Sequence, residues 1–445
     1  MKWLKVSGLV LCGVLLLLAV VPMFVPLNDY VLLVEKQVST ELREPVKIAG
    51  LRAGGLPLPH VTVDGLSIGK AGEITAEHVT ITPDLWSLLG DSKVIHRIRI
   101  DRLTVSQKAL KKIVSWSAAK KGSGAQQVHV QVKQILLKSA LIKLEKTAFG
   151  PFDARVGMND DNGLDVVSVV TTDRRLRVDV KPEAARYRVD ASARDWILPF
   201  NPALHFNALS VHGFATTNQA IFHKVHGELY GGALDGETTL SWVKGIHLKG
   251  KATLSKVEVS SLSQAFGQAP KMSGRLNAKP MFYANATKGD GLLMALHLES
   301  PFDIQDGVLR GVDIEKAATS FFRDEDPSAQ TRFDEISGHL VVDQGARKFT
   351  RLRIAAGGLS AKGRVTVSPD GELSGRITTN VEGAVASASM PLNVSGTVDS
   401  PVVLPPAGIA AGAAVGTAIL GPAGTALGTA LGVKLEQLFG GESAQ

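Results

Sequence analysis

Short stretches in which apolar and polar residues alternate dominate this chain, and they limit what it can fold into. The segment Leu359–Val381 reads LSAKGRVTVSPDGELSGRITTNV. Because successive side chains of a strand point to opposite faces, the alternation predicts two strands, each with one apolar and one polar face. The Pro369-Asp370-Gly371 sequence supplies the turn between them, since proline presets φ and glycine tolerates a positive φ. Something has to cover the apolar face of such a hairpin.

Similar strand patterns fill most of the remaining sequence. Between residues 128 and 258 they are short, regular and separated by turn residues, and no long helical pattern interrupts them. Many short strands at such spacing predict an all-β architecture. The segments expected to form short helices are Tyr30–Leu42, Ser106–Lys121, Val259–Gly267 and Ile314–Arg323.

The N-terminus carries an apolar run, Val6–Val25, preceded by Lys2 and Lys5. About 20 apolar residues are enough to cross a bilayer as a helix. A cleavable signal peptide would have a shorter apolar core and a site of small residues, so we expect an uncleaved anchor instead. The preceding lysines favour a cytoplasmic N-terminus, with the rest of the chain outside the inner membrane. The residues expected within the membrane helix include Val6, Leu15, Leu18, Val21 and Val25.

Composition argues against several functional classes. The chain has 445 residues, 49 Lys plus Arg against 42 Asp plus Glu, and a net charge of +7. This mild positive bias suits contact with an anionic membrane and is not the concentrated basic stripe of a nucleic-acid-binding protein, so no nucleic acid partner is expected. The single cysteine, Cys12, excludes a disulfide within the chain and a cysteine metal cluster.

Sequence motifs for catalysis or metal binding are weak. His223 and His226 are three residues apart on an expected strand, where they would point to opposite faces and could not chelate one ion simply. Asp160, Asn162 and Gly163 suggest a calcium loop, but Val169 stands where a bidentate glutamate is needed, so a hairpin turn is expected. We therefore expect no catalytic residues, no metal and no cofactor.

Five stretches together resemble the AsmA family. They are an N-terminal stretch that begins LPLPHVTVDGLSIG, then GELYGGALDGETTL (Gly227–Leu240), SPFDIQDGVLRGVDIEKAATSFF (Ser300–Phe322), TRFDEISGHLVVDQG (Thr331–Gly345) and MPLNVSGTVDSPVVLPP (Met390–Pro406). The resemblance implies an inner-membrane protein of Gram-negative bacteria with a long periplasmic part. It also implies an elongated, twisted antiparallel sheet, curled lengthwise like a taco around an apolar interior, that is similar to bridge-like lipid-transfer proteins.

The apolar face has two ways of being hidden. It can pack against a second sheet as a dry sandwich, or the sheet can curl around a ligand. Given the resemblance, we expect a groove that holds acyl chains. A six- to eight-residue strand spans roughly 20 to 26 Å, a length comparable to that of an acyl chain. The residues expected to line it are Leu359, Ala361, Val365, Val367, Leu373 and Ile377, with Lys362, Arg364 and Arg376 on the opposite face.

The C-terminal tail is rich in glycine and alanine. Glycines recur every four residues, and Pro422 divides the two series: Gly408, Gly412 and Gly416, then Gly424, Gly428 and Gly432. Small residues at this spacing let helices approach closely in a membrane. We expect a kinked helix or helical hairpin, located in the inner membrane, in the outer membrane or as a plug at the end of the groove. The alternative is an end without fixed structure.

The expected function is the binding and transfer of phospholipid by a protein anchored in the inner membrane, in support of the outer membrane. Two alternatives stay open: an envelope assembly factor that recruits a protein partner by edge pairing and affects outer-membrane protein insertion, and an envelope hydrolase. The expected regions are an anchor (1–27), an N-terminal β region (28–125), a middle β region (126–226), a C-terminal AsmA-like β domain (227–406) and the tail (407–445).

Overall fold

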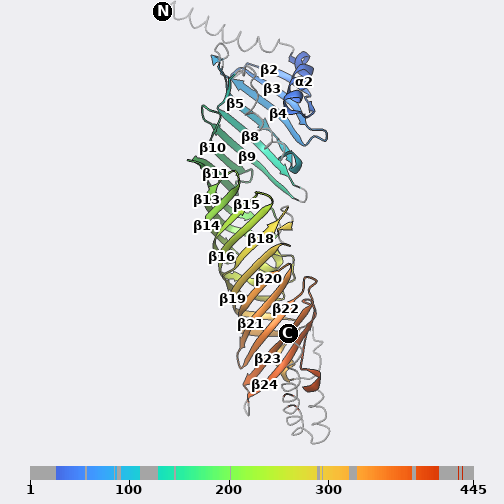
Figure 1. Ribbon diagram of the computed structural model, residues 1–445. Coiled ribbons are helices and arrows are strands. Elements are labelled where there is room, and N and C mark those ends of the chain that lie inside the picture. The colour runs from blue at the N-terminus through green and yellow to red at the C-terminus, as the bar shows by residue number, and fades with distance from the viewer. Residues whose placement is uncertain are drawn as a thin grey trace, which may run out of the picture. The chain divides into compact units, whose positions relative to one another are not determined.

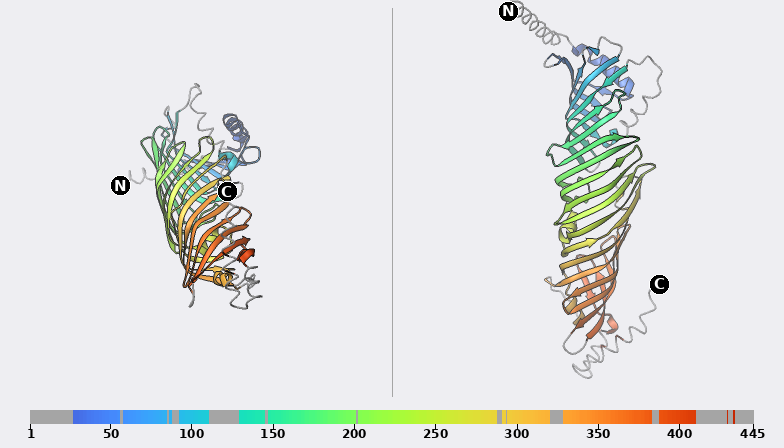
Figure 2. Two further views of the ribbon diagram at one scale, coloured as in Figure 1. Left: turned by 60° about the horizontal axis from the view of Figure 1, so that its bottom comes forward. Right: turned by 90° about the vertical axis from the view of Figure 1, so that its left-hand side faces the viewer.

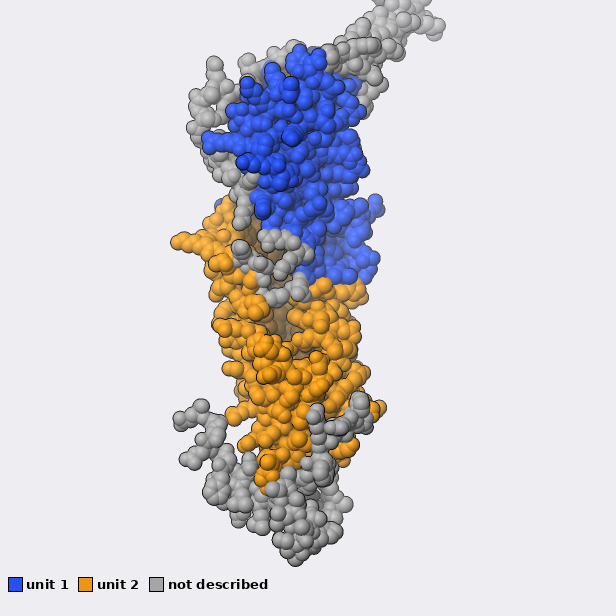
Figure 3. All heavy atoms as spheres, turned by 90° about the vertical axis from the view of Figure 1, so that its right-hand side faces the viewer, with its two compact units in different colours: residues 1–200 blue, residues 201–445 orange. Residues whose placement is uncertain are grey.

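The computed structural model is mainly β, as predicted, with 66 % of the chain in strands (Figure 1). It describes residues 27–55, 58–84, 86–87, 92–110, 129–144, 147–200, 202–287, 291–292, 294–319, 328–382, 387–409, 429 and 433. The chain forms two compact units, residues 1–200 and residues 201–445 (Figure 3). The region boundary expected after residue 226 falls inside a strand, β14 (Gln219–Leu229).

Unit 1 is a mixed sheet that begins under a helix. A 3-10 helix, η2 (Leu27–Tyr30), leads into α2 (Val31–Leu42), so the helix predicted at Tyr30–Leu42 is confirmed. The strands are β1 (Val46–Lys47), β2 (Gly50–Gly54), β3 (His60–Ile68), β4 (Ile74–Pro83), β5 (Ser92–Asp101), β6 (Thr104–Ser106), β7 (His129–Val132), β8 (Gln134–Lys143), β9 (Ala148–Met158), β10 (Leu164–Thr171), β11 (Leu176–Glu183) and β12 (Arg186–Ile197).

The prediction of purely antiparallel pairing is wrong in unit 1. Strand β5 pairs in parallel with β7 and β8, and β6 pairs in parallel with β8. The connection from β6 to β7 runs from residue 107 to residue 128 and starts as a helix at residues 107–110. A crossover connection of that length can return the chain to the end of the sheet at which β5 begins. The next strand, β7, then runs parallel to β5. A helix predicted between two strands was therefore a sign of parallel pairing.

Unit 2 is an antiparallel sheet whose strands follow one another in chain order (Figure 2). The strands are β13 (His205–Ala215), β14, β15 (Gly232–Ser241), β16 (Ile246–Glu258), β17 (Met272–Ala278), β18 (Met281–Ala286), β19 (Leu296–Arg310), β20 (Gln330–Asp343), β21 (Ala346–Ala356), β22 (Leu359–Val367), β23 (Leu373–Glu382), β24 (Ser387–Gly396) and β25 (Pro401–Leu404). Strands β17 and β18 are successive halves of one position, because both pair with β16 and β19 on either side.

Two short helices accompany unit 2. Helix α4 (Val259–Ala265) confirms the helix predicted at Val259–Gly267. Helix α5 (Ile314–Thr319) confirms the first part of the helix predicted at Ile314–Arg323. The hairpin predicted at Leu359–Val381 is confirmed as β22 and β23, joined where the Gly371 N–H donates to the Ser368 carbonyl at 3.0 Å. Gly371 has a φ of 86°, the left-handed region that glycine enters without strain.

The membrane predictions concern residues that the structure leaves undescribed. Val6, Leu15, Leu18, Val21 and Val25 lie outside the described residues, and so do all the tail glycines except Gly408. Among the helices of the described residues, none has the length and apolar character needed to span a bilayer.

Candidate functional site

The sheet of unit 1 carries an unbroken apolar row across its strands. Residues that lie directly opposite one another on neighbouring strands share a face. Followed from β2 to β12, these partners form row A: Ala53, Val61, Ile81, Ile98, Ile135, Val156, Val167, Val180 and Val189. Every member after Ala53 is β-branched, the side-chain type that suits a pleated surface best. Row A therefore makes a continuous apolar band.

A second apolar row runs parallel to row A on the same face. Row B contains Leu51, Val63, Val79, Ile100, Leu137, Ala154, Val169, Val178 and Ala191. The row between them points to the other face and is polar except at one position: Arg52, Thr62, Thr80, Arg99, Leu136, Arg155, Ser168, Asp179 and Asp190. Unit 1 thus has one apolar and one polar face, and the alternation predicted for single strands holds across the whole sheet.

The polar face is tied together by ion pairs between strands. Arg52 on β2 donates to the Asp64 carboxylate on β3 at 2.5 and 2.7 Å, and His78 Nδ1 on β4 lies 2.7 Å from the same carboxylate. The hydrogen bond from Arg52 lowers the pKa of Asp64 below its usual value, against the effect of partial burial, which raises it. On β11, the Arg177 guanidinium likewise lowers the pKa of Asp179. These paired charges lie on the face of the sheet opposite to rows A and B.

Exposure separates row A from an ordinary core. Row A members are half-buried, and Val61 is 36 % exposed. Unit 1 has three buried clusters among its described residues, and none includes a member of row A. A face packed against a second layer would be excluded from water almost completely. Row A is sheltered without being tightly covered by described residues.

Unit 2 has two comparable rows near its first strands. Row C contains Ala215, Ala220, Leu240, Leu248, Ala284 and Leu296, and row D contains Leu209, Gly227, Leu234, Leu254, Ala278, Phe302 and Gly338. All six leucines in them are half-buried and belong to no buried cluster of the described residues. Figure 3 shows a lengthwise hollow in the surface of unit 2, between two rims of atoms.

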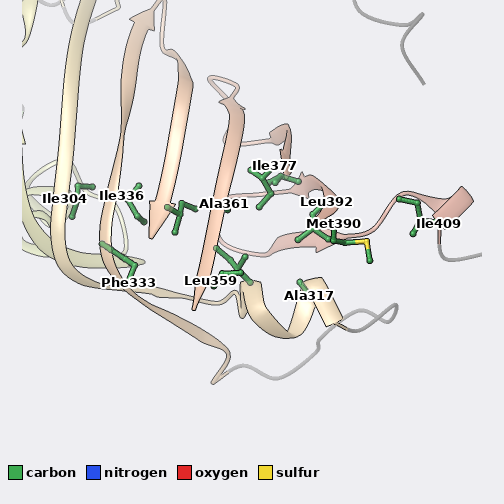
Figure 4. Close-up of a cluster of buried hydrophobic side chains, with 13 residues drawn as sticks. Ile304, Ala317, Phe333, Ile336, Leu359, Ala361, Ile377, Met390, Leu392 and Ile409 are labelled. Carbon is green, nitrogen blue, oxygen red and sulfur yellow. The ribbon is translucent and has the colours of Figure 1, made fainter. Parts of the chain in front are cut away.

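The last strands of unit 2 differ because their apolar face is covered. Row E contains Val257, Leu276, Ile304, Ile336, Ile354, Ala361, Thr379 and Met390. Except for half-buried Leu276, its members are at most 8 % exposed. Ile314 and Ala317 of α5 and Ile409 belong to the same cluster (Figure 4). The partly buried Val433 packs against it. Helix α5 and parts of the tail therefore close this end of the apolar face.

The six residues predicted to line a groove lie on that covered part. Leu359, Ala361 and Ile377 belong to the buried cluster, Val365 and Leu373 pack against it, and Val367 is 6 % exposed. The structure brings all six to one face, while Lys362, Arg364 and Arg376 are exposed on the other. Gly408 is exposed next to Ile409, which is completely buried.

Sequence reasoning missed rows A, C and D. The strands that contribute them were recognised in several cases, but the residues that face each other across strands were not. The signal available was the run of valines and isoleucines at alternate positions, for example Val178 and Val180 on β11. Joining such positions into rows requires the register of each strand pair, and register depends on turn geometry and bulges that a single strand pattern does not carry.

A hollow of about 710 Å³ lies over β14, β15, β16, β18 and β19. Lys249, Tyr283 and His297 line it, and they face one another in register, with the Tyr283 and His297 rings stacked at 4.8 Å. Two contacts between charged groups lie in it: Lys251 pairs with Glu237 at 3.2 Å, and His297 Nε2 lies 3.2 Å from Glu299. The arrangement offers no acid and base aimed at a common point.

Metal-binding motifs also resolve into ordinary contacts. His226 Nδ1 lies 2.7 Å from the Asp235 carboxylate, while the His223 ring stacks on Phe214. Asn159 organises the turn at Asp160–Gly163 by accepting the N–H groups of Asp161 and Gly163. Over the part of the chain that the structure describes, no three His, Cys, Asp or Glu side chains gather as a metal site.

Comparison with known proteins adds no relative: no protein family model, curated protein or solved structure matches this chain.

Proposed function

We propose that this chain is a membrane-anchored, AsmA-like protein of the Gram-negative envelope that binds phospholipid acyl chains along its apolar sheet faces and takes part in phospholipid transfer. The observation that carries the proposal is row A, a band of β-branched side chains that is apolar from β3 to β12 and that stays partly accessible to water along its length. Large exposed apolar surfaces are rare on soluble proteins and mark sites of interaction.

The geometry suits a hydrocarbon ligand better than a specific polar one. Each CH₂ group removed from water contributes about 0.8 kcal/mol, so acyl chains can bind an apolar face without any directional contact. An apolar face of this kind therefore suits a lipid carrier.

The proposed surface is a sheet curled around its ligand, with the lipid tails on the apolar side and the charged rows in water. The half-burial of row A and of the leucines in rows C and D supports this arrangement, since a flat open face would expose its side chains more fully. The anchor proposed at Val6–Val25 would place the described residues in the periplasm.

Photo-crosslinking on adjacent positions tests the proposal. Val180 and Asp179 are neighbours on β11, and Leu248 and Lys249 are neighbours on β16, but each pair divides between the two faces. A photo-reactive amino acid at Val180 or Leu248 should capture phospholipid in the cell, whereas one at Asp179 or Lys249 should not. Capture is read by mass spectrometry of the crosslinked chain.

Two results would reject lipid binding on this face. Equal capture at both members of a pair would mean that lipid does not distinguish the faces. Capture of a protein and no lipid at Val180 and Leu248 would favour the assembly-factor alternative.

A further inference from the structure

Helix α2 is fixed to one edge of unit 1 by both packing and hydrogen bonds. Leu27, Val31, Val34, Val38 and Leu42 pack against a cluster made of Val46, Ile48 and Leu51. Three helical side chains also accept backbone N–H groups of the sheet: Asn28 Oδ1 from Leu51 at 2.9 Å, Glu35 Oε1 from Ile48 at 2.6 Å and Ser39 Oγ from Val46 at 2.9 Å. The helix cannot roll without breaking these contacts, so its outward side is defined.

That outward side is apolar only at its beginning. Tyr30 is 54 % exposed, Leu32 is 77 % exposed and Leu33 is 65 % exposed. One turn later, the exposed positions are Lys36, Gln37 and Thr40. Largely exposed leucines next to each other on a helix that is otherwise well packed are unfavourable in water. The outward side of α2 thus changes from apolar to polar along the helix, as expected if only the N-terminal end of α2 enters an apolar medium.

The position of this patch in the chain indicates the medium. The apolar run ends at Val25, and only Pro26 separates it from Leu27, which already packs in the cluster under α2. No linker therefore stands between the predicted membrane span and the folded unit. Tyrosine, as at position 30, is enriched at the level of lipid headgroups. A lysine near a membrane surface, as at position 36, can extend its ammonium into water.

We propose that Tyr30, Leu32 and Leu33 insert into the interfacial region of the bilayer that holds the predicted span, and that this contact seats the β1–β3 edge of unit 1 on the membrane surface. The partner is the lipid bilayer itself. The inference depends on the membrane anchor within the proposed function and is independent of lipid binding by rows A, C and D.

Spin-label accessibility in lipid vesicles tests the contact with the full chain. Single cysteines are placed at Leu32, Leu33, Gln37 and Thr40 in a Cys12→Ser background, and the protein is reconstituted into phosphatidylethanolamine–phosphatidylglycerol vesicles. All four positions are exposed, so the substitutions leave the packing under α2 intact. Labels at Leu32 and Leu33 should be several-fold better shielded from a water-soluble nickel complex, and more accessible to oxygen, than labels at Gln37 and Thr40.

A label on the native Cys12 separates the possible failures. If Cys12 is in the hydrocarbon but Leu32 and Leu33 are as accessible to nickel as Thr40, the seating proposal is wrong and the anchor stands. If Cys12 is itself in water, both the anchor and the seating are wrong. Neither result alters the crosslinking test of the apolar rows.

Discussion

Ile98 on β5 lies directly opposite Ile135 on β8, across the strand pair at which the sheet of unit 1 becomes parallel. Both side chains are half-buried members of row A. The change of strand direction does not interrupt the apolar row, because a parallel pair keeps directly opposed residues on one face just as an antiparallel pair does. The apolar face of unit 1 is therefore independent of how the chain connects its strands.

Aspartate in row A and aspartate in row E should have different effects. In row A, Ile135→Asp leaves its carboxylate within reach of water. The melting temperature should therefore stay close to that of the parent, while the amount of bound phospholipid falls. In the covered row, Ile336→Asp buries an unpaired charge, which costs several kcal/mol, and the protein should unfold or fail to accumulate. Val367→Asp should behave like Ile336→Asp. Circular dichroism melting and lipid extraction measure the two effects, and an Ile135→Asp variant that unfolds would show that row A is packed.

Ile409 should stabilise the end of unit 2. Its side chain is completely buried in the cluster beneath α5. Replacing a buried isoleucine by alanine removes about 2–5 kcal/mol of folding free energy. Urea unfolding of Ile409→Ala should show this loss, whereas Ile221→Ala, at a position 41 % exposed, should stay within about 0.5 kcal/mol of the parent. An unchanged midpoint for Ile409→Ala would mean that the segment does not cover the cluster in solution.

Glu35 should protect the first edge of the sheet. Its carboxylate accepts the backbone N–H of Ile48 at 2.6 Å, and Ile48 is 9 % exposed. Glu35→Ala leaves that buried donor without a partner, at a cost of about 1–3 kcal/mol. Glu35→Gln keeps an acceptor oxygen and should lose much less. Hydrogen exchange at the Ile48 amide, faster in Glu35→Ala than in Glu35→Gln, checks the difference; equal protection in both would contradict it.

Asp64 should make a small contribution to stability that disappears in acid. The hydrogen bond from Arg52 lowers the pKa of Asp64 in the folded protein. The contribution is therefore complete above the unfolded pKa of about 3.9 and is lost as the pH falls through the lower folded value. Because Arg52 is largely exposed, the effect should be under about 1 kcal/mol. The difference in unfolding free energy between the parent and Asp64→Asn should shrink below about pH 4; a constant difference would exclude this origin.

The apolar run should remain on the mature protein. A span that is not cleaved keeps residues 6–25, so mass spectrometry of the purified chain should find peptides from this segment. A mature N-terminus after Pro26 would instead identify a signal peptide.

The sequence was sufficient to predict a mainly β chain, some of its strands and most of the helices, because alternation and helical spacing are local properties. The hairpin at Leu359–Val381 and the helix at Tyr30–Leu42 follow from residues that are neighbours in the chain. The parallel pairing of β5 with β8 was missed because it depends on where the connection after Ser106 returns the chain. No local pattern at β5 records this.

The candidate site was predictable only in kind. The expectation of an apolar face with an opposite charged face suits the Leu359–Ile377 hairpin, whose six chosen residues share one side. Their burial depends on Ile314 and Ile409, which come from segments that are distant in sequence from β22 and contact this face only in the folded chain. Rows A, C and D could not be recognised in the sequence, because each strand contributes only one residue to a row.

The partial burial of row A also limits which substitutions selection would remove from it. A buried cluster such as that around Leu392, which is 0 % exposed, constrains both the hydropathy and the volume of its members, because neighbours interlock. Row A constrains hydropathy and leaves volume comparatively free, since its members stay partly accessible to water and belong to no buried cluster of the described residues. Among descendants of this chain, valine, isoleucine and leucine should therefore exchange readily along row A, while charged residues stay rare and the positions around Leu392 keep their sizes. The face would then be inherited as a property of the whole row, with no single residue in it indispensable.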